Sequence, residues 1–332
     1  MTAQATLHRI APNRRILLRG CVAIGFAAMV VASLASGPAT AQTYGIATMT
    51  PGSLNHTTAT AIAKVLKEKA GLNVLVQPTA GESVIIPLTA RGEADLGGAN
   101  SLEVRVAVAE GKLSGLRLIG AIHPLPTAFF VRKSTPMRMI ADLKGKKVVY
   151  GFSAQRTIDI VMRAILATSG MTLSDIAPVL VPNVVRGADD FVAGAVDTFY
   201  FAFGAPKVRE VDATVGGIRA LEIPVAGMDA ARRIFAEGYL APAVPNPFFI
   251  GVEKPMGVYT WDNLLFSNDK VKDEIVYKII DTLVKNKSDL VAIQPALRGL
   301  TAEGLYKKHD VPYHPGALKY FADHKIEAKA MR

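Results

Sequence analysis

Apolar and polar residues follow one another along the first part of the chain in a pattern that predicts alternating strands and helices. Apolar runs joined by polar loops predict strands, and apolar residues at helical spacing between them predict helices. The strands are expected at residues 43–49, 72–78 and 96–101, and the helices at 59–71 and 84–95. The order of elements is therefore βαβαβ.

The same order occurs a second time further along the chain. Strands are expected at 146–151, 176–182 and 198–204, and helices at 158–170 and 186–197. A G-x-x-D step precedes the third strand in both halves, as GEAD at 92–95 and GAVD at 194–197. The repeat predicts two similar lobes.

Alternating strands and helices favour open, largely parallel α/β sheets with helices on both faces. Ligands of such sheets bind beyond the carboxyl ends of the strands, so two lobes with polar loops at that edge can face each other across a cleft. Segment 120–133 and the Pro-rich segment 241–255 are expected to be the two crossings of a hinge. From about Asp269 the chain is predicted to be mostly helical, with an apolar stripe that packs on the core.

The first 41 residues have the three parts of an export signal. Basic residues open the chain, the apolar run CVAIGFAAMVVASLA follows, and Ala39–Ala41 forms an A-x-A cleavage site. The signal predicts a periplasmic protein cleaved near Ala41, and it leaves open whether export uses the Sec or the twin-arginine route. The mature domains are expected to be lobe 1, residues 42–124 plus 245–332, and lobe 2, residues 125–244.

Composition excludes several classes of function. The only cysteine, Cys21, lies in the leader, so the mature chain has no disulfide, catalytic thiol or cysteine metal site. The leader carries four of the 38 basic residues and no acidic one, so the net charge falls from +10 to +6 on cleavage. No basic run with interleaved aromatic residues occurs, which argues against a nucleic-acid partner.

No pattern of catalytic, metal or cofactor residues stands out, and we expect no enzyme activity, metal or cofactor. His309 and His314 lack the spacing of a zinc pair on one helix face, and neither a P-loop nor a G-x-G-x-x-G turn occurs. Ser153 in GFSAQ has the position of a serine nucleophile between strand and helix, but Gln155 replaces the second glycine of G-x-S-x-G. A periplasmic serine hydrolase that uses Ser153 is therefore the alternative from another class.

The junction between the strand at 146–151 and the helix at 158–170 predicts a seat for an anion. A helix start presents unpaired N–H groups and the positive end of the helix dipole. Arg156 can add bidentate hydrogen bonds to a carboxylate, phosphate or sulfonate. The other interpretation is that Arg156 points outward and pairs with solvent or a nearby acidic residue.

Several segments together resemble the TAXI family of solute receptors that serve TRAP transporters. They are the signal, the stretch GIATMTPGSLNHTTATAIAKVLKEKAGLNVLVQPTAGE, the step ARGEADLGGANS, and the segments LKGKKVVYG, DTFYFAFGAP and YHPGALKYFAD. The resemblance implies a two-lobed, type II-like periplasmic binding fold that closes on a small, often carboxylate-bearing solute and delivers it to TRAP membrane subunits. Family members commonly have G-x-x-G-G-x-Y-Y in the first loop and G-S-G-T in the second, and both loops differ here.

The sequence thus predicts a periplasmic receptor for a small, anionic solute, and a receptor for a membrane sensor is a further alternative. Glu82 is expected to favour an amine or hydroxyl on the ligand and to repel an acid. The ligand-binding residues are expected at the cleft edge of both lobes: Thr50, Ser53, Asn55, Thr79, Glu82, Asn100 and Ser101 in lobe 1, and Ser153, Gln155, Arg156, Thr157, Phe203 and Gly204 in lobe 2.

Overall fold

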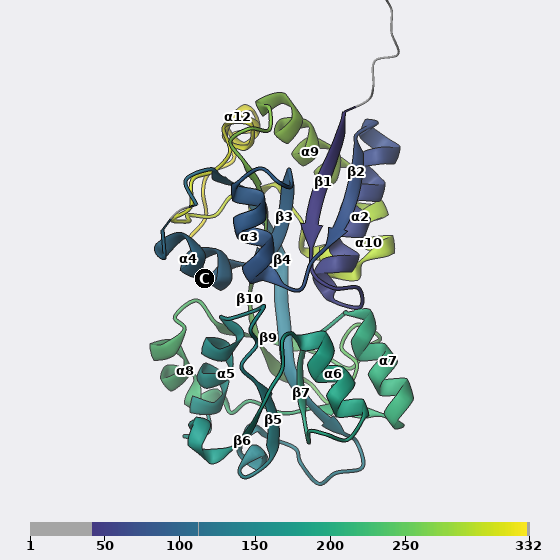
Figure 1. Ribbon diagram of the computed structural model, residues 1–332, viewed down its shortest axis with the longest axis vertical. Helices are drawn as coiled ribbons and strands as arrows, with labels where there is room; N and C mark the ends of the chain where they lie inside the picture. The colour runs from purple at the N-terminus through teal and green to yellow at the C-terminus, as the bar shows by residue number, and fades with distance from the viewer. Residues whose placement is uncertain (1–41, 112, 331–332) are drawn as a thin grey trace, which may run out of the picture. The chain divides into compact units, whose positions relative to one another are not determined.

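The first lobe is built on three parallel strands with helices between them, in the order that the sequence predicted (Figure 1). The computed structural model describes residues 42–111 and 113–330, and the predicted signal segment lies outside them. Strand β1 pairs in parallel with both β2 and β3. The elements are β1 (Thr43–Thr48), α2 (Leu54–Ala70), β2 (Asn73–Pro78), α3 (Glu82–Ala90), β3 (Leu96–Asn100) and α4 (Ser101–Ala109).

The second lobe repeats this order and then continues with further short elements. Strand β5 pairs in parallel with β6, and a single bridge between Val148 and Thr198 joins β5 to the start of β7. The elements are β5 (Lys147–Tyr150), α5 (Ile158–Ala167), β6 (Ala177–Leu180), α6 (Val184–Val192), β7 (Phe199–Ala202), α7 (Pro206–Val215), β8 (Ile218–Ala220), α8 (Met228–Ile234) and β9 (Tyr239–Ala243).

The repeated G-x-x-D step has the same structural task in both lobes. The Asp95 carboxylate accepts a hydrogen bond from Gly45 N at 2.7 Å, and Asp197 accepts one from Lys147 N at 2.8 Å. Each aspartate also donates its own N–H to the carbonyl of the same partner. The carboxylate thus fastens the turn before the third strand to the beginning of the first strand. The internal repeat predicted from the sequence is confirmed at this position.

Two long antiparallel strands connect the lobes. Strand β4 (Leu116–Arg132) pairs with β10 (Met256–Asn268) from Leu116 to Thr127, and its later residues pair with β7 and β8. At the other end β10 pairs with β3 in the first lobe, and its beginning pairs with β9. The strands therefore form one continuous mixed sheet, ordered β2-β1-β3-β10-β4-β7, with a small β5-β6 sheet beside it.

The second crossing is β10, whereas the sequence suggested the Pro-rich segment 241–255. That segment stays with the second lobe, where Glu253 pairs with Arg219 at 2.9 Å and Phe248 packs against Gly204. Strand β10 pairs with β3 of the first lobe and with β9 of the second, so β10 is the strand that spans both lobes. The exact domain boundaries remain a prediction.

The C-terminal part returns to the first lobe as helices. They are α9 (Asp273–Lys285), α10 (Lys287–Ile293), α11 (Ala302–Leu305) and α12 (Pro315–Asp323). Among them lies the short 3-10 turn Pro295–Gly299, and earlier in the described chain such turns lie at Ile140–Leu143, Leu173–Asp175 and Val225–Gly227. The predicted stripe on α9 is buried through Val276, Ile279, Ile280 and Leu283. These side chains share an apolar core with α2 and α12, so the stripe packs on the core as expected.

We predict that Gly97→Ala destabilises the first lobe. A Cβ at Gly97 would lie 2.5 Å from the Phe266 ring and 2.6 Å from Thr89 Oγ1, so the core between β3, α3 and β10 would have to shift. Overpacking of this kind costs about 1–3 kcal/mol. Urea unfolding measures the loss, and Gly98→Ala is the matched control because its Cβ would meet nothing nearer than 3.8 Å. Equal stability of the two variants would contradict the packing argument.

Candidate ligand site between the lobes

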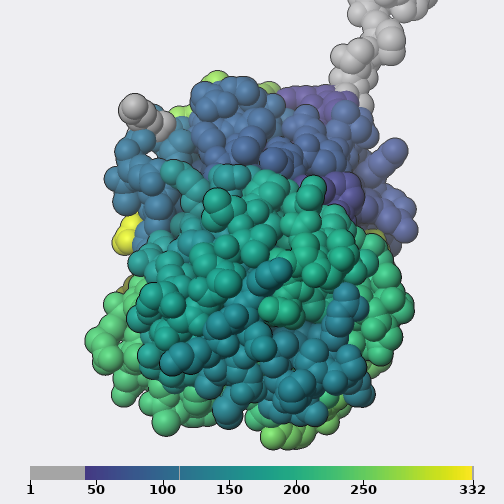
Figure 2. Space-filling view, turned by 60° about the horizontal axis from the view of Figure 1, so that its bottom comes forward, coloured from purple at the N-terminus to yellow at the C-terminus, as the bar shows by residue number. Residues whose placement is uncertain are grey.

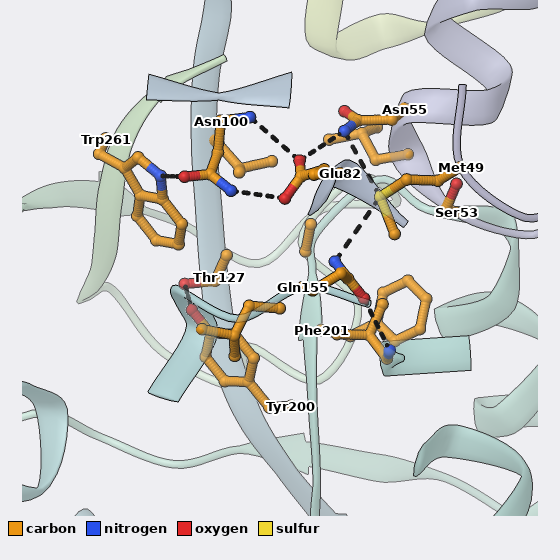
Figure 3. A pocket seen from close by; sticks show the side chains of 15 residues that line it. Met49, Ser53, Asn55, Glu82, Asn100, Thr127, Gln155, Tyr200, Phe201 and Trp261 are labelled. Carbon is orange, nitrogen blue, oxygen red and sulfur yellow. Dashed lines mark hydrogen bonds between the residues drawn. The ribbon is translucent and has the colours of Figure 1, made fainter. Parts of the chain in front are cut away.

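A narrow pocket lies where the two lobes meet at the β4–β10 crossing (Figure 3). The space left inside is about 40 Å³, which is room for a few water molecules. A larger solute therefore enters only when the lobes move apart. The lining residues come from both lobes and from the crossing strands: Met49, Ser53, Leu54, Asn55, Glu82, Asn100, Leu125, Thr127, Gln155, Ile158, Val184, Tyr200, Phe201, Ala202 and Trp261.

The first-lobe wall is organised around the carboxylate of Glu82, at the start of α3. Its Oε1 accepts hydrogen bonds from Asn55 Nδ2 at 2.8 Å and Asn100 N at 3.0 Å, and Oε2 accepts one from Asn100 Nδ2 (Figure 3). Asn100 Oδ1 in turn accepts from Trp261 Nε1 at 3.1 Å. One buried side chain thus joins the start of α2, the end of β3 and the crossing strand β10.

Burial shifts the pKa values of two ionisable side chains, one in this wall and one behind it. Glu82 is only 2% exposed, and desolvation, together with the nearby charge of Glu103, raises its pKa to about 7. The hydrogen bonds from Asn100 and Asn55 oppose that rise. Behind the wall, burial lowers the pKa of His123 to about 4, so this imidazole is neutral at pH 7. It contacts Asn263 at 3.2 Å, which donates to Asn55 at 2.9 Å.

The opposite wall is mostly apolar and aromatic, with few polar atoms. Tyr200 OH donates a hydrogen bond to Thr127 Oγ1 at 2.6 Å, and the Thr127 hydroxyl donates one to the Tyr259 carbonyl at 3.0 Å. Gln155 Oε1 accepts from Val184 N at 3.0 Å, while its Nε2 has only Met49 Sδ within reach, at 3.6 Å. The amide of Gln155 therefore retains N–H groups directed at the pocket region (Figure 3).

The predicted anion seat at the start of α5 is occupied by the protein's own Glu103. This carboxylate, on α4 of the other lobe, accepts from Thr157 N at 2.9 Å and from the Thr157 hydroxyl, and it also accepts from the Ser83 hydroxyl. Glu103 is 2% exposed. A buried carboxylate at a helix start is stabilised by the N–H groups and the dipole, so Glu103 holds the second lobe against the first.

Backbone contacts support this closed arrangement. Ser83 N donates to Ala154 O at 3.2 Å, Lys207 N donates to Gly52 O at 3.1 Å, and Asn183 Nδ2 donates to Ala80 O at 3.1 Å. On the face shown in Figure 2, the teal atoms of the second lobe lie directly against the blue and purple atoms of the first, without an open groove. The structure is therefore that of closed lobes.

Five of the predicted ligand-binding residues line the pocket: Ser53, Asn55, Glu82, Asn100 and Gln155. Ser53 caps α2, accepting from His56 N at 3.1 Å. Thr157 and Ser101 are buried near the pocket without lining it, Thr157 because it binds Glu103 and Ser101 because it lies in the first turn of α4.

The remaining predicted residues lie outside the pocket. Arg156 is 55% exposed and pairs with Glu110 at 3.1 Å, which is the outward arrangement that the sequence left open. Ser153 is also exposed, and no base among the described residues is hydrogen-bonded to its hydroxyl. Thr50 donates to the Thr79 carbonyl at 3.1 Å, so these two residues join the loops after β1 and β2.

The expected aromatic wall is displaced by two and three positions, from Phe203 to Phe201 and Tyr200 on β7. Phe203 is completely buried between Phe130 and Phe249, and Gly204 lies against Phe248 on another surface groove. The pocket is instead lined by Tyr200, Phe201 and Ala202. Sequence reasoning assigned the contact to the strand exit, whereas the lobe closes on the body of the strand.

Sequence reasoning missed the contributions of the crossing strands and of Glu103. Leu125 and Thr127 lie in the segment expected to be a hinge, which was a signal that they border the cleft. Trp261 is the only tryptophan of the chain, but its strand was not predicted. Glu103 follows Asn100 in an N-x-x-E pattern that marks a helix start, and nothing local shows that its carboxylate reaches the other lobe.

Comparison with known proteins gives the family. The model of the NMT1-like family matches residues 46–324. The chain belongs to the NMT1-like family. A solved structure described as a periplasmic transporter is similar to this NMT1-like protein with a TM-score of 0.58 at 13% identity, covering 87% of this chain and 94% of that one. At this identity the likeness shows the fold, a two-lobed periplasmic binding protein fold with a mixed sheet and flanking helices.

Two further solved structures resemble this NMT1-like protein more distantly. The alkanesulfonate-binding protein SsuA from Xanthomonas axonopodis pv. citri, bound to MOPS, has a TM-score of 0.48 at 16% identity, with 78% of this chain and 80% of that one covered. An ancestral arginine-binding protein bound to arginine has a TM-score of 0.48 at 14% identity, with 76% and 96% covered.

The described part of the chain offers neither a membrane span nor a metal cluster. Across residues 42–111 and 113–330, no helix is long and apolar enough to cross a bilayer. The same residues contain no group of three or more His, Cys, Asp or Glu side chains arranged to hold a metal ion.

We predict that Thr157→Val weakens the closed state. The variant removes the hydroxyl hydrogen bond to the Glu103 carboxylate, and bonds to charged groups contribute about 1.5–3 kcal/mol. Urea unfolding should show a loss of that order, and small-angle X-ray scattering should show a larger radius of gyration. Thr60→Val is the control, because the Thr60 hydroxyl is exposed and bonds only its own helix. Identical behaviour of both variants would mean that Glu103 does not hold the lobes.

We also predict that Glu82 makes the protein less stable as the pH rises. Its folded pKa is about 7 against an ordinary value of 4.5, so its contribution is fully present below pH 4.5 and is lost as the pH rises through 7. Between pH 5 and pH 8 the loss is about 2–3 kcal/mol. Unfolding free energies at both pH values should differ less in Glu82→Gln than in the wild type. The exposed Glu68→Gln should keep the wild-type difference, and an unchanged slope in Glu82→Gln would refute the assignment.

Proposed function

We propose that this protein is a periplasmic solute receptor that binds a small molecule between its lobes and does no chemistry on it. The observation that carries the proposal is the pocket itself, which both lobes and both crossing strands line. Sites between lobes with a few directed polar groups and an apolar remainder are typical of small-molecule binding. Closure around the solute would be a rigid-body movement about β4 and β10.

Within the NMT1-like family, we assign the protein to the TAXI-type receptors that deliver solutes to TRAP membrane subunits. The support is the resemblance of the signal, loop and strand-exit segments noted in the sequence. A receptor that releases its solute to a separate membrane protein must open there, and lobes held by a few hydrogen bonds suit that requirement. The predicted export signal, which lies outside the described residues, supports a periplasmic location.

An anionic solute, the other expectation from the sequence, has weaker support from the site geometry. Arg156 is engaged with Glu110, and the start of α5 holds Glu103. A serine hydrolase is not favoured either, since Ser153 is exposed and lies outside the pocket. The proposed function is therefore binding and delivery of a small solute.

The test uses Trp261, the only tryptophan of the chain, which lines the pocket. Protein purified gently from the periplasm should release a small molecule on denaturation, identified by mass spectrometry. After unfolding and refolding to remove it, adding it back should change the tryptophan fluorescence with one-to-one saturation.

Ala202→Phe, which fills the pocket, should abolish this fluorescence change, whereas Ala213→Phe on the exposed face of α7 should leave it intact. Uptake into vesicles that contain the TRAP membrane subunits should then require the receptor. Turnover of the released molecule, or its binding to Ala202→Phe with unchanged affinity, would overturn the proposed function.

A further inference from the structure

The pocket contains a carboxylate and no cation. Among its fifteen lining residues, Glu82 carries the only charge, and no lysine, arginine or histidine is present. The lining residues around Glu82 are amides, hydroxyls and apolar side chains. A negatively charged solute in this space would meet an uncompensated carboxylate at short range, and low polarity strengthens that repulsion.

Three basic side chains of the interlobe region are paired with acidic residues outside the pocket. Arg156 binds Glu110 at 3.1 Å, and Arg105 binds Glu237. Lys207 binds both Asp189 and Glu210 at 2.6 Å. The positive end of α5, which a solute anion would otherwise use, is filled by Glu103. Each feature that led the sequence toward an anion is thus satisfied within the protein.

The polar atoms that remain without a strong partner at the pocket indicate a ligand other than an anion. A carboxylate offers about four acceptor positions. Glu82 accepts two hydrogen bonds at Oε1 and one at Oε2 from the described residues. One acceptor position on Oε2 is therefore open to a ligand. Two donors are also available. In the described part of the chain, Gln155 Nε2 contacts only the weak acceptor Met49 Sδ. The Ser53 hydroxyl accepts a hydrogen bond from His56 N, and among the described residues it donates none.

We infer that the site selects a small solute without net negative charge, one that presents an N–H or O–H donor to Glu82 and an acceptor to Gln155 or Ser53. The inference rests on the proposed function, because it describes the solute that the receptor would carry. An amine, amide or alcohol satisfies the open acceptor position of Glu82, and the rest of the molecule packs against Tyr200, Phe201 and Trp261. Glu82 is then the residue that determines specificity.

The experiment compares probes that differ in charge and little in shape. The pairs are L-glutamine with L-glutamate, succinamide with succinate, and ethanolamine with glycolate. Binding to ligand-free protein is measured by Trp261 fluorescence and thermal shift at pH 8, where Glu82 is ionised because its pKa is about 7. The solute retained on purification, identified by mass spectrometry, is the fourth probe.

In any pair that binds, the member without net negative charge should bind at least tenfold more tightly than the anionic member. The retained solute should also lack net negative charge. A retained organic anion, or tighter binding of the anionic members, would overturn the inference and leave the receptor function standing. If nothing is retained and no probe binds, the proposed function fails, and this inference fails with it.

A variant tests the role of Glu82 directly. Glu82→Gln should weaken binding of the preferred member ten- to a hundredfold and reduce its advantage over the anion to less than threefold. Glu68→Gln removes an exposed carboxylate of the same lobe outside the pocket and should change neither value. If Glu82→Gln does not fold, binding of the probe pairs to the wild-type protein still tests the inference. Tighter binding of the anionic members to the wild type would contradict it.

Discussion

The closed form of this protein depends on one carboxylate that reaches from one lobe to the start of a helix in the other. Glu103 on α4 accepts hydrogen bonds from the backbone and hydroxyl of Thr157 and from Ser83. Removing a charged group from water is costly, and it is tolerated here because the Thr157 N–H, two hydroxyl groups and the dipole of α5 compensate it. The same contacts bring Gln155, two residues before Thr157, to the edge of the pocket. A helix start that would attract an anion in an open protein is in this way used for closure.

A second buried carboxylate gives the pocket its chemical character. Glu82 is held by Asn55 and Asn100, and through them it is linked to Trp261 and to the neutral His123. These hydrogen bonds fix the directions of the Glu82, Asn55 and Asn100 side chains. Among the described residues, every donor to Glu82 is an amide N–H and none is a cation, so no positive charge of this part of the protein is paired with the carboxylate. In the proposed receptor, recognition and the stability of the first lobe would therefore share the same residues.

The long strands β4 and β10 extend through both lobes. Each strand belongs to the first lobe at one end and to the second at the other, and their pairing joins strands of both lobes into one sheet, with β5 and β6 in a separate one. Leu125 and Thr127 lie on β4 and Trp261 lies on β10, so the crossing itself forms part of the pocket. A change in the twist or bend of this pair would move the lobes and the pocket walls together. The register shifts near Asn263 and Leu265 place local irregularities within the crossing.

The sequence alone determined the repeated βαβαβ order, the shared G-x-x-D step, the helical C-terminal part and five of the pocket residues, because these follow from local periodicity and from the rule that ligands lie beyond strand ends. It also indicated that the start of α5 attracts an anion. Only the tertiary structure decided that this anion is Glu103, that Arg156 turns to Glu110, and that β10 rather than the Pro-rich segment makes the second crossing. Those outcomes depend on contacts between residues far apart in the chain, such as Glu103 with Thr157 and Asn100 with Trp261. Local patterns carry no information about which distant partner satisfies a buried charge, and packing of the whole chain makes that choice.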